Sequence, residues 1–404
     1  MKAAEFSSPT STSPLKRIIA VALLACSILL LAVGLRGESG NLAKRDFIAY
    51  WSAGQLLVHH GNPYSDVDVY ALEKQEGFRE AGASTMLNPP WAMIFVLPLG
   101  FVSAYVGALI WILLIVACIM FSVRVLQTVN HGEGSQDHLL AYAFAPVLAC
   151  IMGGQMSGFA CLSISLFLLW INTRPFLAGV AAIALTIKPH LFGLFFLILL
   201  IDSIRKKDLR AMAGVCVGLV VATAVPLAFN HHLLMQYLVR DRVAQIGEAF
   251  IPTVSFVLRL FIHRNSLWIQ FLPEVIAIAW GIWYYHQNRK DWHWNKHGLL
   301  VLVVSLWAAP YSTFLDELVL MPAVVSAIYL TSDNSRSGKG VLPAYFVLNG
   351  IAFALLFAQV PVMSGAYIWT TTAWLIWYVF SVSGKQRCIG VESAVVAGNA
   401  QQSL

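Results

Sequence analysis

Long runs of apolar residues, separated by short polar segments, make up most of the chain. A helix that crosses a bilayer needs about 20 residues, and the runs between charged residues, Pro and Gly give about twelve candidate spans. These are residues 18–35, 103–126, 138–153, 156–171, 176–187, 190–204, 211–229, 267–287, 297–309, 315–331, 341–359 and 366–383. Residues 89–101 are expected to form a short helix that dips into the membrane. The pattern predicts an all-α polytopic membrane protein.

Several predicted spans are short and interrupted, as at Gly153-Gly154, Pro189 and Pro310. Such breaks are tolerated at membrane depth only where protein or a watery cavity receives the freed backbone groups. The breaks therefore predict a cavity among the helices. Two longer segments, 36–88 and 230–266, carry apolar residues at helical spacing and predict amphipathic helices along the membrane surface.

Composition agrees with this interpretation. The chain is 58% hydrophobic and 11% charged, whereas about a quarter of the residues of a soluble globular protein are charged. The net charge of +6 would suit nucleic acid, but the Lys and Arg residues sit in short loops, where they set orientation. We therefore exclude nucleic acid as a partner. The charge distribution predicts cytoplasmic termini, with 36–88 and 230–266 outside. Residues 1–17 and 384–404 are expected to be disordered tails flanking one integral membrane domain, 18–383.

Polar side chains at membrane depth are costly, so each is a candidate for function. They occur in Arg45-Asp46, in the GGQ string that ends at Gln155, and in the IKPH string that contains Lys188. Two more occur at Arg259 and at Asp316. Although scattered along the chain, all fall at or near the predicted outer face. This convergence favours one shared site that faces the outer compartment.

Each candidate has a structural and a chemical interpretation. Asp46 is either a charge at the start of a helix or a general base that takes a proton from a hydroxyl. Lys188 is either a snorkelling lysine or a phosphate ligand, and Arg259 is either a loop cation or a second phosphate contact. Gln155 is expected in a helix-breaking turn that brings its amide into the cavity. Asp316 is either a first-turn acid or a buried partner of Lys188 or an arginine.

Metal binding is not expected. The adjacent pairs His59-His60 and His231-His232 point to different faces of a helix, and no third ligand has suitable spacing. We expect no metal site and no cofactor.

The order of the motifs resembles glycosyltransferase family 87, the polyprenyl-phosphate-mannose-dependent mannosyltransferases and their bacterial relatives. The resemblance rests on RDFIAYWSAGQLLVHHGNPY, LNPPWAMIFVLPLG, the GGQ turn, IKPH and PYSTFLDELVLMP, and it runs from about residue 40 to about residue 330. Asn88 stands where the family has an aromatic residue before Pro-Pro, and Ala309-Pro310 replaces its Ser-Pro.

The resemblance implies a GT-C type bundle that uses a polyprenyl-phosphate sugar as donor and inverts the anomeric carbon. It implies Asp46 as the catalytic residue and matches Asn88, Gln155, Lys188 and Asp316 to positions of the family's motifs. We expect these four residues to bind substrate, together with Arg45, His190 and Arg259. The expected function is transfer of a hexose, mannose by resemblance, to a lipid-linked or glycan acceptor. The expected location is the outer face of a bacterial inner membrane. The alternative is a polytopic transporter or lipid flippase, in which buried Lys and Asp relay protons or substrate.

Overall fold

The computed structural model describes residues 46–78, 81–132, 135–240, 250–332 and 340–382. Within these ranges the regular secondary structure is helical and contains no strand. The first half contains α2 (Asp46–Val58), α3 (Asp66–Gln75), η2 (Pro90–Ala92), α4 (Met93–Val96), η3 (Leu97–Phe101), α5 (Ala104–Val129), η4 (Asp137–Ala143), α6 (Ala145–Gly153), α7 (Ser157–Trp170), α8 (Pro175–Ala181), η5 (Ala182–Ile187) and α9 (Pro189–Lys206). The second half contains α10 (Arg210–Phe229), α11 (Leu233–Val239), α13 (Val254–Ile262), η6 (Leu267–Phe271), α14 (Leu272–Asn288), η7 (Trp294–Gly298), α15 (Leu299–Trp307), η8 (Phe314–Leu320), α16 (Met321–Ser332), α17 (Val341–Phe357), η10 (Gly365–Tyr367) and a helix over 370–382.

The all-helical membrane architecture is confirmed, but a count of about twelve spans is not. Among the described residues, four helices are long and apolar enough to cross a membrane: Ala104–Val129, Arg210–Phe229, Leu267–Asn288 and Phe314–Thr331. Of the other predicted spans, 156–171, 190–204 and 341–359 correspond to the single helices α7, α9 and α17, which contain 14, 18 and 17 residues. Others are divided into short helical pieces. For example, predicted span 176–187 is α8 followed by the 3-10 helix η5. The predicted first span, 18–35, and both predicted tails lie outside the described residues.

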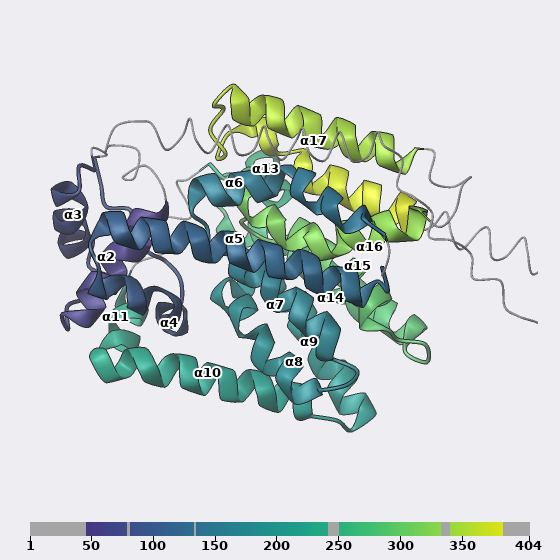
Figure 1. Ribbon diagram of the computed structural model, residues 1–404, viewed down its shortest axis with the longest axis horizontal. Coiled ribbons are helices and arrows are strands. Elements are labelled where there is room, and N and C mark those ends of the chain that lie inside the picture. The colour runs from purple at the N-terminus through teal and green to yellow at the C-terminus, as the bar shows by residue number, and fades with distance from the viewer. Residues whose placement is uncertain (1–45, 79–80, 133–134, 241–249, 333–339, 383–404) are drawn as a thin grey trace, which may run out of the picture.

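The helices differ in what they face. Phe314–Thr331 is almost entirely buried and lies at the centre of the bundle, whereas α5 and α10 expose rows of large apolar side chains. Such extended apolar surface is typical of lipid contact rather than of water. In Figure 1, α5 and α10 run lengthwise along the bundle, and α17 lies along another side of it.

Small residues let two of the helices approach closely. α8 and α10 pack along each other, and a Cβ atom added at Gly179 would lie 1.9 Å from the carbonyl oxygen of Ala211. Close backbone contact through small residues is a common way to pack helices in membranes, because lipid provides no hydrophobic driving force between them.

The prediction of surface-lying amphipathic helices in 36–88 is wrong for α2. Nine of the 13 residues of α2 are buried, including Phe47, Tyr50 and Trp51, and the helix packs against η3. Aromatic and small residues occur on all its faces, so it has no wide polar stripe to turn toward water. α3 matches the prediction better, because Val69 and Glu73 face inward while most of its other side chains are exposed.

Candidate active site

A left-handed turn places Gln155 in the interior. α6 ends at Gly153, and Gly154 follows with φ of +69°, a conformation that only glycine adopts without cost. The turn is held by Trp111, whose Nε1 donates to the carbonyl oxygen of Gly154 at 2.7 Å, and by the Gln155 N–H, which donates to Cys150 O at 3.1 Å. The predicted helix-breaking turn is therefore confirmed.

An ion pair joins two segments that are far apart in the sequence. Lys188 precedes Pro189 at the start of α9, and its Nζ lies 2.5 Å from Oδ1 of Asp316. Asp316 also accepts hydrogen bonds from Ser157 Oγ at 2.9 Å, Thr313 N at 3.0 Å and Thr313 Oγ1 at 3.2 Å. The capping box with Thr313 and the pairing with Lys188 coexist, so both interpretations of Asp316 hold.

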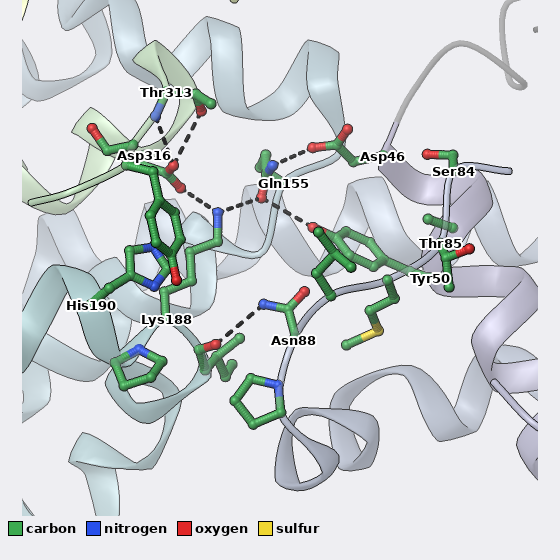
Figure 2. A pocket seen from close by; sticks show the side chains of 18 of the residues that line it. Asp46, Tyr50, Ser84, Thr85, Asn88, Gln155, Lys188, His190, Thr313 and Asp316 are labelled. Carbon is green, nitrogen blue, oxygen red and sulfur yellow. Dashed lines mark hydrogen bonds and ion pairs between the residues drawn. The ribbon is translucent and has the colours of Figure 1, made fainter. Parts of the chain in front are cut away.

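The amide of Gln155 connects this ion pair to Asp46. Its Oε1 accepts from Lys188 Nζ at 3.2 Å and from Tyr50 Oη at 3.1 Å, and its Nε2 donates to Oδ2 of Asp46. Because two donors hold the carbonyl oxygen, the amide nitrogen is directed at the carboxylate. Figure 2 shows the resulting chain, from Asp316 through Lys188 and Gln155 to Asp46.

Asp46 begins α2 and is partly exposed. The pKa of its carboxyl is raised from 3.8 to about 6. Burial is the largest cause and the charge of Asp316 acts in the same direction, while the charge of Lys188 and the hydrogen bond from Gln155 oppose the rise. Within the described part of the chain, its second oxygen, Oδ1, has no hydrogen-bond partner. The ionised carboxylate is thus favoured at neutral pH, and no described residue occupies its second oxygen.

These groups line a cavity of about 370 Å³. Loop residues of the segment that precedes η2 form one wall, and residues near the start of α9 and before η8 form another. The lining residues are Asp46, Ala49, Tyr50, Ser84, Thr85, Met86, Leu87, Asn88, Pro89, Gln155, Ile187, Lys188, Pro189, His190, Tyr237, Ile251, Tyr311, Ser312, Thr313, Asp316 and Met363.

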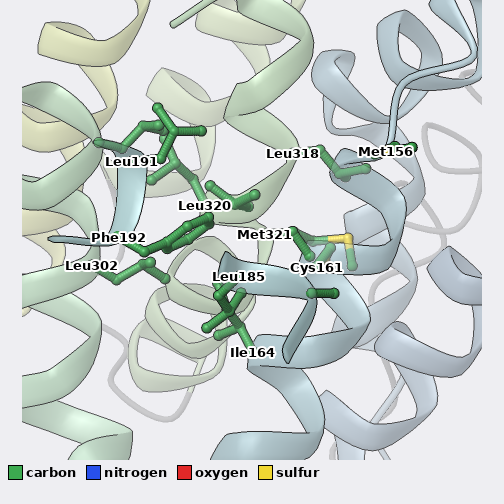
Figure 3. Close-up of a cluster of buried hydrophobic side chains, with 14 of the residues drawn as sticks. Met156, Cys161, Ile164, Leu185, Leu191, Phe192, Leu302, Leu318, Leu320 and Met321 are labelled. Carbon is green, nitrogen blue, oxygen red and sulfur yellow. The ribbon is translucent and has the colours of Figure 1, made fainter. Parts of the chain in front are cut away.

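Packed apolar side chains lie behind the polar groups. Figure 3 shows this cluster, in which Met156, Leu185, Leu191, Phe192 and Leu318 are all buried. The low polarity of this layer strengthens the electrostatic interactions of the residues in front of it. It also makes an unpaired charge there expensive, which favours the pairing of Lys188 with Asp316.

The structure brings most of the predicted residues together. Asp46, Asn88, Gln155, Lys188, His190 and Asp316 all line the cavity. Asn88 donates from Nδ2 to Ile187 O at 3.3 Å, and the ring of His190 lies against that of Tyr311, with their centroids 3.7 Å apart.

One predicted residue lies away from the cavity, and another is not described. Arg259 is buried in α13, with its guanidinium 4.9 Å from the ring centroid of Phe256, and it is not among the residues that line the cavity. Its assignment as a phosphate ligand stays a prediction. Arg45 lies outside the described residues.

Sequence reasoning missed three hydroxyl groups that build the site, those of Tyr50, Ser157 and Thr313. Tyr50 had a detectable signal, because it follows Asp46 by four residues and so shares its face of the helix. Thr313 also had a local signal, because Thr-x-x-Asp before an apolar run is the sequence pattern of a capping box. Ser157 had none, since its role depends on Asp316, which is far from it in the sequence.

The model of glycosyltransferase family 87 matches residues 87–311, more than half of the chain. This range includes Asn88, Gln155, Lys188, His190 and Arg259, whereas Asp46 and Asp316 lie outside it. No curated protein and no solved structure matches the chain. The chain is a glycosyltransferase with apolar membrane helices, and it belongs to glycosyltransferase family 87.

Proposed function

We propose that the protein is an inverting transferase. It moves a hexose, with mannose expected from the resemblance, from a polyprenyl-phosphate sugar to a lipid-linked or glycan acceptor. Family membership supports sugar transfer, and one observation supports the chemistry: Asp46 and Lys188 contact opposite ends of one amide within one cavity. No observation favours the transporter or flippase alternative.

Inversion by direct displacement needs a base on the acceptor and positive charge near the leaving group. In the proposed step the acceptor hydroxyl oxygen bonds to the anomeric carbon as the bond from that carbon to the phosphate oxygen breaks. The hydroxyl proton goes to Asp46, and the electron pair of the broken bond goes to the lipid phosphate. Asp46 suits this task because its carboxylate is ionised at neutral pH and Oδ1 is available to a hydroxyl group.

Lys188 is assigned to the departing phosphate. An ammonium has three N–H donors, and those of Lys188 reach Asp316 and Gln155. In the described part of the chain the third donor has no partner, so it is available to a phosphate oxygen. Asp316 is a positioning residue in this scheme, because it holds the ammonium in place.

The outer face of the membrane is the proposed location of this chemistry. α9 contains 18 residues and is about 27 Å long at about 1.5 Å per residue, close to the bilayer core of about 30 Å. Lys188 lies at one end, and Arg205, Lys206 and Lys207 lie at the other. Basic residues in short loops mark the cytoplasmic side, and this distribution supports a cavity that faces the outer compartment.

The deciding experiment incubates the purified protein with radiolabelled polyprenyl-phosphate hexoses and alkyl glycoside acceptors. We expect consumption of the donor and a product of inverted anomeric configuration, as read by NMR. Asp46→Asn is expected to abolish most turnover, while Asp68→Asn, an exposed acid of α3, is the matched control. A product of retained configuration would contradict the single-displacement chemistry.

A further inference from the structure

The cavity has one wall made from consecutive residues of an extended segment. Residues 83–87 form neither helix nor turn, and all six residues from 84 to 89 line the cavity. We call residues 84–88 the wall segment. Figure 2 shows Ser84 and Thr85 on the Asp46 side of the cavity, while His190 lies on the far side of Lys188.

Hydrogen bonds to four residues outside the segment hold the wall segment in place. Glu73, fully buried in α3, accepts a hydrogen bond from the backbone N–H of Ser84 at 3.0 Å. Asp66 accepts from Thr85 Oγ1 at 2.6 Å and also pairs with Arg240 at 2.6 Å. Burying a carboxyl group is costly, and the buried Glu73 carboxyl is directed through Oε2 at the backbone of the wall segment.

A third anchor lies at the end of the wall segment. Tyr64 Oη donates to the carbonyl oxygen of Asn88 at 2.9 Å, and the Asn88 side chain reaches Ile187 O. The wall segment is therefore fixed against α3, the loop before it and η5. A surface that is ordered before its ligand arrives loses little entropy on binding.

The wall segment offers the groups that a neutral sugar needs. In the described part of the chain, the hydroxyl of Ser84 and the backbone N–H groups of Thr85, Met86 and Leu87 have no protein partner. The hydroxyl oxygen of Thr85 donates to Asp66 and can still accept. Met86 and the ring of Tyr237 add apolar surface, against which the carbon face of a pyranose packs.

Charge decides which ligands fit this side of the cavity. The wall segment has no charged side chain, and Asp46 beside it is negative when ionised. Lys188, the cation among the described lining residues, is directed at Gln155 and Asp316. Arg240 behind Thr85 is paired with Asp66, so no described residue that lines this side of the cavity offsets the repulsion between Asp46 and an anionic acceptor.

We propose that the wall segment is an acceptor subsite, which binds an uncharged pyranose through Ser84, Thr85 and backbone N–H groups and presents its hydroxyl to Asp46. The proposal rests on the proposed function, and it places the donor on the Lys188 and His190 side. This division agrees with in-line displacement, in which acceptor and leaving group occupy opposite sides of the anomeric carbon.

The test separates acceptor binding from donor binding. Octyl mannoside serves as acceptor probe and farnesyl-phosphate mannose as donor probe. Thr85→Val and Ser84→Ala are expected to raise the acceptor KM about fivefold, the loss of one neutral hydrogen bond, with the donor Kd unchanged by fluorescence titration. Thr85→Ser, which keeps the hydroxyl, should restore the acceptor KM, and Asp68→Asn is the control.

Further outcomes decide between the two proposals. An octyl glucuronide should be a poorer acceptor than octyl glucoside, and equal KM values would contradict an uncharged subsite. An unchanged acceptor KM in both Thr85→Val and Ser84→Ala, or a raised donor Kd in either, would overturn the acceptor subsite while leaving the transferase in place. A wild-type protein that binds the donor probe but never consumes it would instead overturn the proposed function.

Discussion

Replacing Asp46 with Asn is expected to stabilise the protein while it destroys activity. A pKa raised from 3.8 to about 6 means that the folded state binds the proton more tightly than the unfolded state does. At neutral pH this corresponds to a loss of up to about 3 kcal/mol of folding free energy. Asn removes the charge but keeps an oxygen that can accept the hydrogen bond from Gln155.

The pH dependence of this gain follows from the same pKa values. Well below pH 3.8 Asp46 is protonated in both the folded and the unfolded state, so the difference in stability between the variant and the wild type should no longer depend on pH and the gain should be lost. As the pH rises through the interval from 3.8 to about 6, the wild type loses stability relative to Asp46→Asn. The full difference is expected above that interval, when turnover of the variant is lower by about 10²–10⁴.

The measurement is the free energy of unfolding by SDS titration at about pH 4 and about pH 7.5, combined with donor turnover. If Asp46 were only a charge at the start of a helix, it would stabilise the folded protein by about 0.3–1 kcal/mol. The free energy of unfolding of the Asn variant would then be lower than that of the wild type. A variant that is destabilised at neutral pH, or whose gain does not change with pH, would refute the reasoning.

Three further predictions test the framework around the site. Lys188→Met should destabilise the protein by about 3–5 kcal/mol in SDS titration, because it leaves a buried charge unpaired. Adding Asp316→Asn should recover part of this loss. An unchanged stability in Lys188→Met alone would contradict the pairing. Gln155→Glu should move the acid limb of the pH–rate profile to higher pH, since a second carboxylate disfavours ionisation of the base, and an unmoved limb would argue against their contact. Gly179→Ala should lower the free energy of unfolding by about 1–3 kcal/mol because of overpacking. Gly218→Ala on α10 is the control and should lower it little, because an added Cβ there would lie 3.5 Å from its nearest neighbour. Equal losses of stability in the two variants would contradict the close approach of α8 and α10.

The sequence by itself determined the class of protein and most of the candidates. Long apolar runs with few charges are incompatible with a soluble fold, because their transfer into an apolar environment is strongly favourable. In such a chain each polar residue stands out, which is why Asp46, Gln155, Lys188 and Asp316 could all be selected. The Gly-Gly break before Gln155 also has a purely local cause, since glycine tolerates a positive φ.

Only the tertiary structure decided how these residues act together. The contacts from Gln155 to Asp46 and from Lys188 to Asp316 join residues more than a hundred positions apart, and no local pattern specifies such pairs. The same holds for the burial of α2, for the position of Arg259 away from the cavity and for the anchoring of the wall segment by Glu73. Hydropathy reports how strongly a segment prefers an apolar environment, whereas the neighbours of a side chain depend on how the helices pack, and packing is a property of the whole bundle.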